Sequence, residues 1–215
     1  MKEKALIILG GNSKLISKLL EYNLFKLYKK IILISHRKYN GKLNFEIIEF
    51  LDPKLIEKTL ENIISSDQFE FDLIISNTPP QNSDFQNSNT LEWSMATLKI
   101  MKMNSLTKKF RRLIYTGSCL PLLPFYHESF YKTLKNNEMK SFIKLDLRLN
   151  KNQTYIILPP LKFKSDKRIN LIFDNYEKWA LILKEELSYN NSIVYPRGIV
   201  GIITKILFFI KFRKI

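Results

Sequence analysis

The feature that most constrains the fold is a regular alternation of short apolar runs with longer segments of helical period. This alternation is typical of repeated strand and helix units, in which parallel strands form one sheet and helices cover both of its faces. Most of the runs are apolar throughout, as strands buried on both faces should be. Seven strands are predicted, at residues 4–9, 31–35, 45–50, 72–76, 112–117, 154–158 and 192–196.

The segments between these runs predict the helices. Asp52 followed by Pro53 marks the start of one, because an aspartate caps a helix and a proline suits its first turn. Helices are expected at 13–28, 53–65, 91–104, 126–148 and 174–188. The 215 residues are enough for one sizeable core and few for two. We therefore expect a single doubly wound α/β domain over 1–198, followed by an apolar and basic tail at 199–215.

Composition narrows the function classes. The net charge of +15 is compatible with phosphate binding, but the basic residues are spread from Lys2 to Lys214 and form no nucleic-acid-binding module, so no nucleic-acid partner is expected. The single cysteine, Cys119, fits a reducing compartment, and we expect it to pack rather than react. One Cys and two His predict no metal site. The short N-terminal apolar run lacks a signal-peptide cleavage site, so a cytoplasmic location is expected.

A glycine turn follows the first predicted strand, in the segment LGGNSKLISKLL at 9–20. Backbone N–H groups at such a helix start can hold a phosphate. The second strand runs into Ser-His-Arg-Lys at 35–38, which in a dinucleotide-binding sheet lies beside the adenosine ribose. An arginine there accommodates a 2′-phosphate, so Arg37 and Lys38 favour NADP(H) over NAD(H); a solvated loop charge is the alternative.

A serine and a Tyr-x-x-x-Lys pair occur together in YTGSCLPLLPFYHESFYKTLK at 115–135. A chain so rich in Tyr and Lys contains such pairs by chance, and a second one occurs at Tyr22. Only Tyr131 has a serine in a meaningful place, because Ser118 lies just past a predicted strand, where open parallel sheets bind ligands. Tyr131 and Lys135 are four residues apart and so share a helix face. A cation beside a phenol lowers the pKa of that phenol, which suits proton transfer near neutral pH.

This arrangement resembles the short-chain dehydrogenase/reductase superfamily, in which a serine at the end of the fifth strand precedes the Tyr of Tyr-x-x-x-Lys by 13 residues, as Ser118 precedes Tyr131. The resemblance covers essentially the whole chain. It implies a Rossmann-like fold and hydride transfer between a nicotinamide and a carbonyl or alcohol carbon. It also implies that Ser118 binds the substrate oxygen, that Tyr131 exchanges its proton, and that Lys135 lowers the pKa of Tyr131 and binds the ribose. The cofactor contacts that it implies are Gly10, Asn12, Ser13, Lys14, Arg37, Asp52, Asn77 and Lys135.

The chain departs from the family's glycine pattern. Of the three phosphate-loop glycines only Gly10 is kept, and Lys14 and Ile16 stand at the other two positions. A side chain at the second position crowds the pyrophosphate, unless Lys14 contacts a phosphate instead. Pro79 and Pro160 replace two further family glycines. These departures keep a second hypothesis open, a noncatalytic binding or scaffold protein with an eroded cofactor loop.

The C-terminal tail is apolar over 199–210 and ends in a basic cluster. Lys205 interrupts it, and crossing a bilayer takes about 20 apolar residues. Its Lys and Arg suit the interface of an anionic membrane, and a helix packed on the core or on a second subunit of a homo-oligomer is the alternative. The tail resembles those of short-chain reductases of bacterial surface-polysaccharide synthesis, which implies a carbohydrate-like substrate, nucleotide- or lipid-linked, at the inner membrane face. The segment at 161–173 is expected to set specificity.

Overall fold

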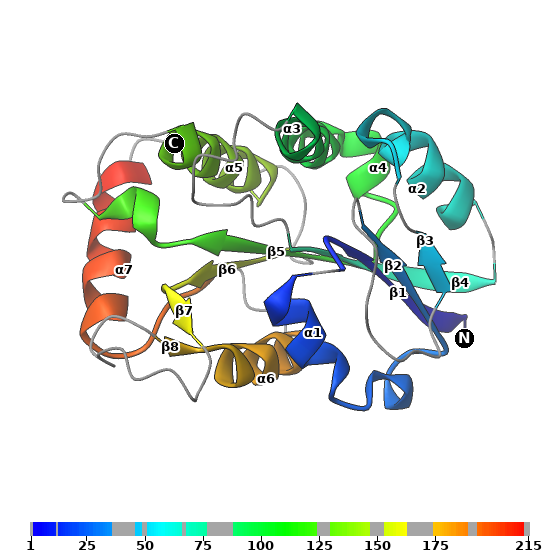
Figure 1. Cartoon of the computed structure of the whole chain (residues 1–215), viewed down its shortest axis with the longest axis horizontal. Coiled ribbons are helices and arrows are strands. Elements are labelled where there is room, and N and C mark those ends of the chain that lie inside the picture. The colour runs from blue at the N-terminus through cyan, green and yellow to red at the C-terminus, as the bar shows by residue number, and fades with distance from the viewer. Residues whose placement is uncertain are drawn as a thin grey trace.

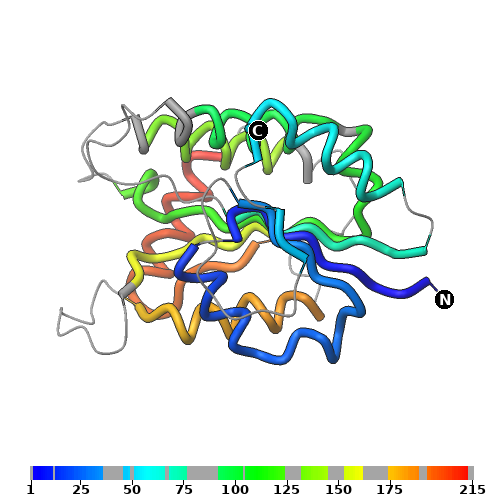
Figure 2. Tube along the Cα trace, turned by 45° about the vertical axis from the view of Figure 1, so that its right-hand side comes forward, coloured from blue at the N-terminus to red at the C-terminus, as the bar shows by residue number. Residues whose placement is uncertain are grey.

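Seven parallel strands form one sheet between two layers of helices, as Figure 1 and Figure 2 show for this computed structural model. The model describes residues 2–11, 13–35, 46–48, 51–65, 68–76, 88–123, 130–146, 153–162, 174–188 and 193–212. The side chains at 88–91, 104, 130, 131, 145, 146 and 162 lie outside this description.

The strands lie in the order β3-β2-β1-β4-β5-β6-β9, and each adjacent pair is parallel. The chain therefore winds outward from β1 in one direction and from β4 in the other, and the predicted doubly wound, Rossmann-like sheet is confirmed. The strands are β1 (Glu3–Leu9), β2 (Lys30–Ile34), β3 (Glu46–Ile48), β4 (Phe69–Ile75), β5 (Arg112–Ser118), β6 (Gln153–Leu158) and β9 (Ile193–Val194).

The helices form two layers with separate hydrophobic cores. The α-helices are α1 (Lys14–Leu20), α2 (Ile56–Ile64), α3 (Ser88–Lys102), α4 (Asn104–Thr107), α5 (Phe130–Asp146), α6 (Tyr176–Glu186) and α7 (Gly198–Phe212). Helices α1 and α6 lie on one face of the sheet, and α2, α3 and α5 lie on the other (Figure 1). Side chains of α1 and α6 pack in one core, and those of α2, α3, α5 and α7 pack in the other. Strand β1 serves both, because successive side chains point to opposite faces: Ile7 and Leu9 enter one core, and Leu6 and Ile8 the other.

One predicted helix is divided. The pattern over 13–28 predicts a single helix, but α1 ends at Leu20 and only a short 3-10 turn, η1 (Leu24–Lys26), follows. The chain bends there because Tyr28 is buried beneath the sheet, where its hydroxyl donates to Asp72 Oδ2 at 2.6 Å. That partner is distant in sequence, so helical periodicity carries no sign of the break.

Two very short strands were not predicted. They are β7 (Leu161–Lys162) and β8 (Asp174–Asn175), which pair with each other in parallel outside the main sheet. The Asp174 N–H also donates to the Pro160 carbonyl at 3.0 Å. This pairing joins the two ends of the segment that we expect to set specificity.

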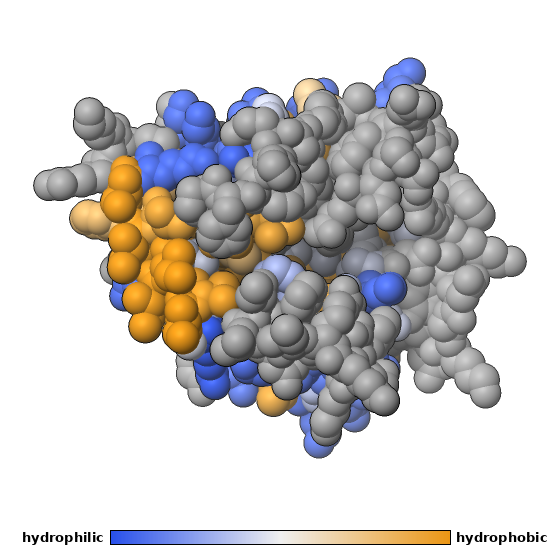
Figure 3. Space-filling view, turned by 60° about the vertical axis from the view of Figure 1, so that its left-hand side comes forward, coloured by the Kyte–Doolittle hydropathy of each residue, from blue (hydrophilic) through white to orange (hydrophobic). Residues whose placement is uncertain are grey.

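Helix α7 packs across the β9 end of the sheet, with one side in the core and the other facing outward. Phe208 and Phe212 on its inner side are buried with the residues of the larger core. Its outer side forms an apolar area on the molecular surface (Figure 3). No helix in the described part of the chain is both long enough and apolar enough to cross a membrane.

Candidate active site at the carboxyl edge of the sheet

The turn after β1 is built for close approach of the backbone. Gly10 has a φ of 81°, in the left-handed region that favours glycine, and its N–H donates to the Ile34 carbonyl at 2.9 Å. A Cβ on Gly11 would lie 3.1 Å from the Leu33 Cβ, so this position also leaves little room for a side chain. The two glycines therefore let the turn after β1 pack its backbone closely against the end of β2.

Ser13 begins the helix that follows. Its Oγ accepts from the Ile16 N–H at 3.2 Å and lies 3.2 Å from the Oγ of Ser76, at the end of β4. Lys14 is exposed in the first turn of α1, whereas Ile16 is fully buried in the core shared with α6. The two residues that replace family glycines therefore differ in position: the Ile16 side chain packs into the core, whereas the Lys14 side chain lies at the surface.

Asp52 lies beside the end of β2. Its carboxylate accepts from the Lys54 N–H at 2.9 Å and caps a 3-10 turn, η2 (Pro53–Leu55), as the sequence predicts for a capping residue. The neighbouring Leu51 N–H donates to the Ser35 carbonyl at 3.4 Å, which fixes this turn next to β2. Three further predicted cofactor contacts lie outside the described residues: Asn12, Arg37 and Asn77.

These described groups fit a dinucleotide. Strands β1 and β4 are neighbours at the point where the winding of the sheet reverses direction, which is where open α/β sheets bind ligands. Gly10 and Ser13 follow the carboxyl end of β1, and Asp52 follows the carboxyl end of β3, so all three lie at the carboxyl edge of the sheet. The N–H groups of Gly10, Gly11 and Ser13 already donate to β2 or within the turn, and the exposed Lys14 adds a positive charge beside them.

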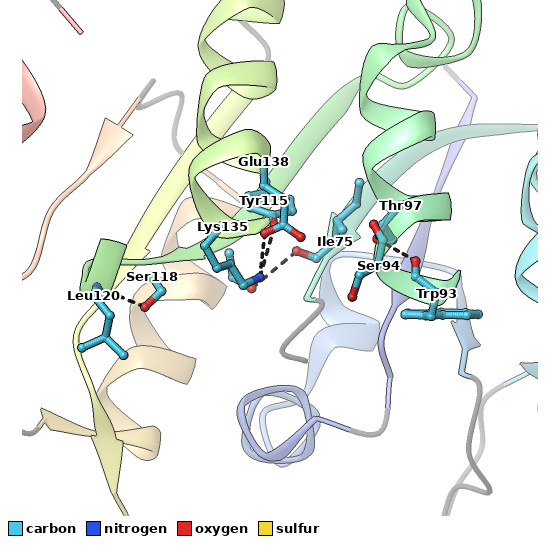
Figure 4. Close-up of polar contacts among 10 residues, drawn as sticks. Ile75, Trp93, Ser94, Thr97, Tyr115, Ser118, Leu120, Lys135 and Glu138 are labelled. Carbon is cyan, nitrogen blue, oxygen red and sulfur yellow. Dashed lines mark hydrogen bonds and ion pairs between the residues drawn. The ribbon is translucent and has the colours of Figure 1, made fainter. Parts of the chain in front are cut away.

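Ser118 is the last residue of β5 and is buried (Figure 4). Its Oγ accepts from the Leu120 N–H at 3.3 Å, at the start of the turn η4 (Leu120–Leu122). Within the described part of the chain this leaves the hydroxyl hydrogen of Ser118 for a substrate oxygen. Gly117 precedes it because a Cβ there would lie 2.0 Å from the Tyr155 hydroxyl of the adjacent strand.

Lys135 is almost completely buried against β5, on helix α5 (Figure 4). Its Nζ lies 2.7 Å from Glu138 Oε2 and donates to the Tyr115 hydroxyl at 3.4 Å. The Tyr115 hydroxyl in turn donates to the Glu138 carboxylate. No role for Glu138 or Tyr115 was predicted from the sequence. Glu138 nevertheless follows Lys135 by three residues and so shares its helix face. A buried lysine needs such a counter-ion, because an unpaired buried charge costs several kcal/mol.

Tyr131 lies in the first turn of α5, one turn before Lys135. The α5 helix therefore puts the two residues on one face, as predicted, while the Tyr131 side chain lies outside the description. The other Tyr-x-x-x-Lys pair is not helical, because Tyr22 follows the end of α1 and Lys26 belongs to η1. The Tyr22 hydroxyl donates to the Glu177 carbonyl at 3.4 Å, a structural contact between the turn after α1 and helix α6.

Cys119 next to Ser118 should be inert in the folded protein. Burial raises the pKa of its thiol to about 12, so the reactive thiolate is scarce at neutral pH. We expect labelling by a thiol reagent at pH 7.5 to be at least about a hundredfold slower than in urea-unfolded protein. The reaction is followed by absorbance or intact mass. Equal rates in the two states would mean that Cys119 is exposed and would contradict the structure.

Comparison with known proteins places the fold. No family model matches the sequence, and no curated protein matches it. Solved structures do: a short-chain dehydrogenase from Burkholderia cenocepacia in complex with NADP superposes with a TM-score of 0.69 at 13% identity, over 98% of this chain and 94% of that one. The chain has the short-chain dehydrogenase fold.

Two other proteins of this fold act on sugars. Aldohexose dehydrogenase from Thermoplasma acidophilum gives a TM-score of 0.67 at 13% identity, over 94% of this chain and 95% of that one. The dTDP-glucose 4,6-dehydratase from Bacillus anthracis, in complex with NAD, gives 0.63 at 11% identity, over 97% of this chain and 81% of that one. At these identities the likeness concerns the short-chain dehydrogenase fold alone.

Proposed function

We propose that the chain is an NADP(H)-dependent short-chain reductase or dehydrogenase that interconverts a carbonyl and a secondary alcohol on a sugar-like substrate. The observation that carries the proposal is the placement of Ser118 at the carboxyl end of β5 and of Lys135 on the helix packed beside it. Tyr131 lies one turn before Lys135. The solved short-chain dehydrogenase folds that act on sugars support a carbohydrate, which we infer to be nucleotide- or lipid-linked.

In this mechanism the protein binds the reacting oxygen and moves its proton. Ser118 donates a hydrogen bond to the carbonyl oxygen, because its Oγ accepts from the Leu120 N–H and a hydroxyl can donate at the same time. Tyr131 gives its proton to the same oxygen as negative charge develops there. Lys135, on the same face of α5, favours the resulting tyrosinate through its positive charge.

The cofactor proposal rests on the edge formed by β1, β2 and β4. A bound nicotinamide dinucleotide would supply or accept the hydride. The turn at Gly10, with Asn12, Ser13 and Lys14, would hold its pyrophosphate, and Asp52 and Asn77 would contact the adenine side. Lys135 would bind the nicotinamide ribose and Arg37 the 2′-phosphate. Fluorescence titration of the purified protein with NADPH and NADH tests the proposal, and binding of neither would overturn it.

Replacing Arg37 tests whether this residue selects NADPH over NADH. Replacing it with serine removes the cation that meets the 2′-phosphate, and we expect NADPH affinity to fall by about tenfold or more while NADH affinity changes little. The matched control is Arg197→Ser, an exposed arginine next to α7. Equal losses for NADPH and NADH in the Arg37 variant would show that this residue does not select the cofactor.

A second candidate function is a noncatalytic binding protein of the same fold. The observation in its favour is that the buried charge of Lys135 is already paired with Glu138. The two functions differ in turnover. A panel of nucleotide-linked and free keto-sugars, assayed with NADPH, separates them, because a noncatalytic protein with an eroded cofactor loop oxidises no NADPH with any substrate.

A further inference from the structure

Helix α7 presents an apolar stripe to the outside of the molecule. Six large side chains are spaced by one, three or four residues, so they share one side of the helix, and each is between 41% and 69% exposed. Together they form the apolar area over α7 in Figure 3. We call this set the α7 stripe: Ile199, Ile202, Ile203, Ile206, Phe209 and Ile210. A contiguous apolar surface of this kind marks a site of interaction.

The opposite side of α7 fixes the stripe in its outward position. Phe208 and Phe212 are buried in the core, and the Tyr195 ring meets Phe208 edge-on at 5.7 Å. A Cβ on Gly201 would lie 1.7 Å from the Pro196 carbonyl oxygen, so the helix starts in close contact with the chain before it. The helix therefore cannot turn its stripe inward without losing these contacts.

Basic side chains border the stripe. At 100° per residue, Lys205 lies about 40° from Phe209 at one border of the stripe, whereas Lys211 lies about 80° from Ile203 on the other side, toward α5. The Lys211 Nζ donates to Asn136 Oδ1 of α5 at 2.6 Å, which places that face of α5 beside α7. Lys140 and Lys144, both exposed, follow Asn136 on the same face at intervals of four residues. An anionic surface would thus meet lysines on both sides of the apolar stripe.

The sequence around α7 has only one sign of charge. Residues 187–215 contain five Lys and Arg and no Asp or Glu. A second copy of this chain would bring the same basic border and a net charge of +15 against it. A stable dimer of standard size also takes about 20 to 30 residues from each partner, whereas the α7 stripe offers six. Among the described residues, the other exposed large apolar side chains lie away from α7, at Phe25, Leu27, Leu55, Met95 and Leu181.

We infer that α7 is a membrane-interface helix, which lies flat on an anionic phospholipid surface with the α7 stripe in the acyl boundary. Its bordering lysines then reach the lipid phosphates, as expected for an interfacial helix. Its 15 residues span about 22 Å, which is short of the roughly 30 Å hydrocarbon core. This inference is independent of the proposed oxidoreductase activity, because it uses none of the site residues.

Vesicle co-sedimentation tests this inference. The full-length protein is incubated with phosphatidylcholine vesicles that contain or lack phosphatidylglycerol, at low and at high salt. We expect binding to the anionic vesicles that falls as salt rises, because exposed charges are then screened. The variant with Ile206→Gln and Phe209→Gln should bind at least about tenfold more weakly to the same vesicles, since two apolar side chains are lost from the contact.

Matched control variants distinguish the effect of the α7 stripe from the general effect of losing exposed apolar or basic side chains. Met95→Gln with Leu181→Gln removes two exposed apolar side chains from α3 and α6 and should bind like the wild type. Lys205→Glu should weaken binding to anionic vesicles more than Lys58→Glu, an equal charge change at an exposed site on α2. Wild-type protein that binds neither vesicle, or a stripe variant that binds as well as the wild type, would overturn the inference. The inference would also be overturned if the wild type bound no vesicles and light scattering found it to be a dimer, while the stripe variant was a monomer.

Discussion

Replacement of Lys135 with methionine is expected to lower the free energy of unfolding by about 3 to 5 kcal/mol. The Lys135 ammonium and the Glu138 carboxylate are both buried, and they lie 2.7 Å apart. Methionine fills a similar volume, but it leaves the Glu138 charge unpaired in the core, and that unpaired charge is the main cost. Urea unfolding followed by circular dichroism measures the change.

Two further variants make this measurement specific. The double variant Lys135→Met with Glu138→Gln should recover most of the loss, because glutamine is neutral and its carbonyl oxygen still accepts from the Tyr115 hydroxyl. Lys99→Met is the matched surface control: its ion pair with Glu57 has the same 2.7 Å distance, but Lys99 is 69% exposed. It should cost less than about 1 kcal/mol. A Lys135 variant as stable as the wild type, or no recovery in the double variant, would contradict the buried pair.

Tyr131→Phe is expected to reduce kcat/KM by about 100- to 10,000-fold, the usual contribution of one proton-transfer group. Phenylalanine keeps the ring and removes the hydroxyl that the mechanism uses. NADPH affinity and thermal stability should stay near the wild-type values, because the proposed cofactor contacts and the buried pair at Lys135 remain. NADPH oxidation with the most active keto-sugar of the panel gives the rate.

The chain contains its own control for Tyr131. Tyr22→Phe removes the hydroxyl of the other Tyr-x-x-x-Lys pair, whose role is a contact with the Glu177 carbonyl. It should leave turnover unchanged and cost about 1 kcal/mol of stability at most. Full turnover in the Tyr131 variant would remove the acid/base role of that residue even if cofactor binding were intact.

Most of the fold was predictable because it follows from local patterns. Short, fully apolar runs in the sequence predict strands that are buried on both faces. All seven strands of the main sheet lie where this pattern places them. The break in the first helix was not predictable, because it serves a hydrogen bond between Tyr28 and Asp72, which are 44 residues apart. Strands β7 and β8 have two residues each, too few for any periodicity.

The candidate site divides in the same way. Motif spacing led to Ser118 and Lys135; the structure has Ser118 at the carboxyl end of β5, and Lys135 on α5 with its Nζ at the Tyr115 hydroxyl of β5. Their immediate partners were not predicted, although Glu138 follows Lys135 by three residues: the partners are the Leu120 N–H for Ser118, and Glu138 with Tyr115 for Lys135. Ser118 and Lys135 have these partners because they are buried: a polar or charged group at the surface can be solvated by water instead.

The sequence by itself determined the alternation of strands and helices, the glycine turn after β1, and the spacing of Ser118, Tyr131 and Lys135. These features depend on periodicity and on backbone conformation, which neighbouring residues control. Only the tertiary structure decided that Glu138 neutralises Lys135 in the core, and that the side of α7 bearing Ile206 faces outward. Both depend on which distant side chains exclude water from a given face, and that is a property of the packed chain.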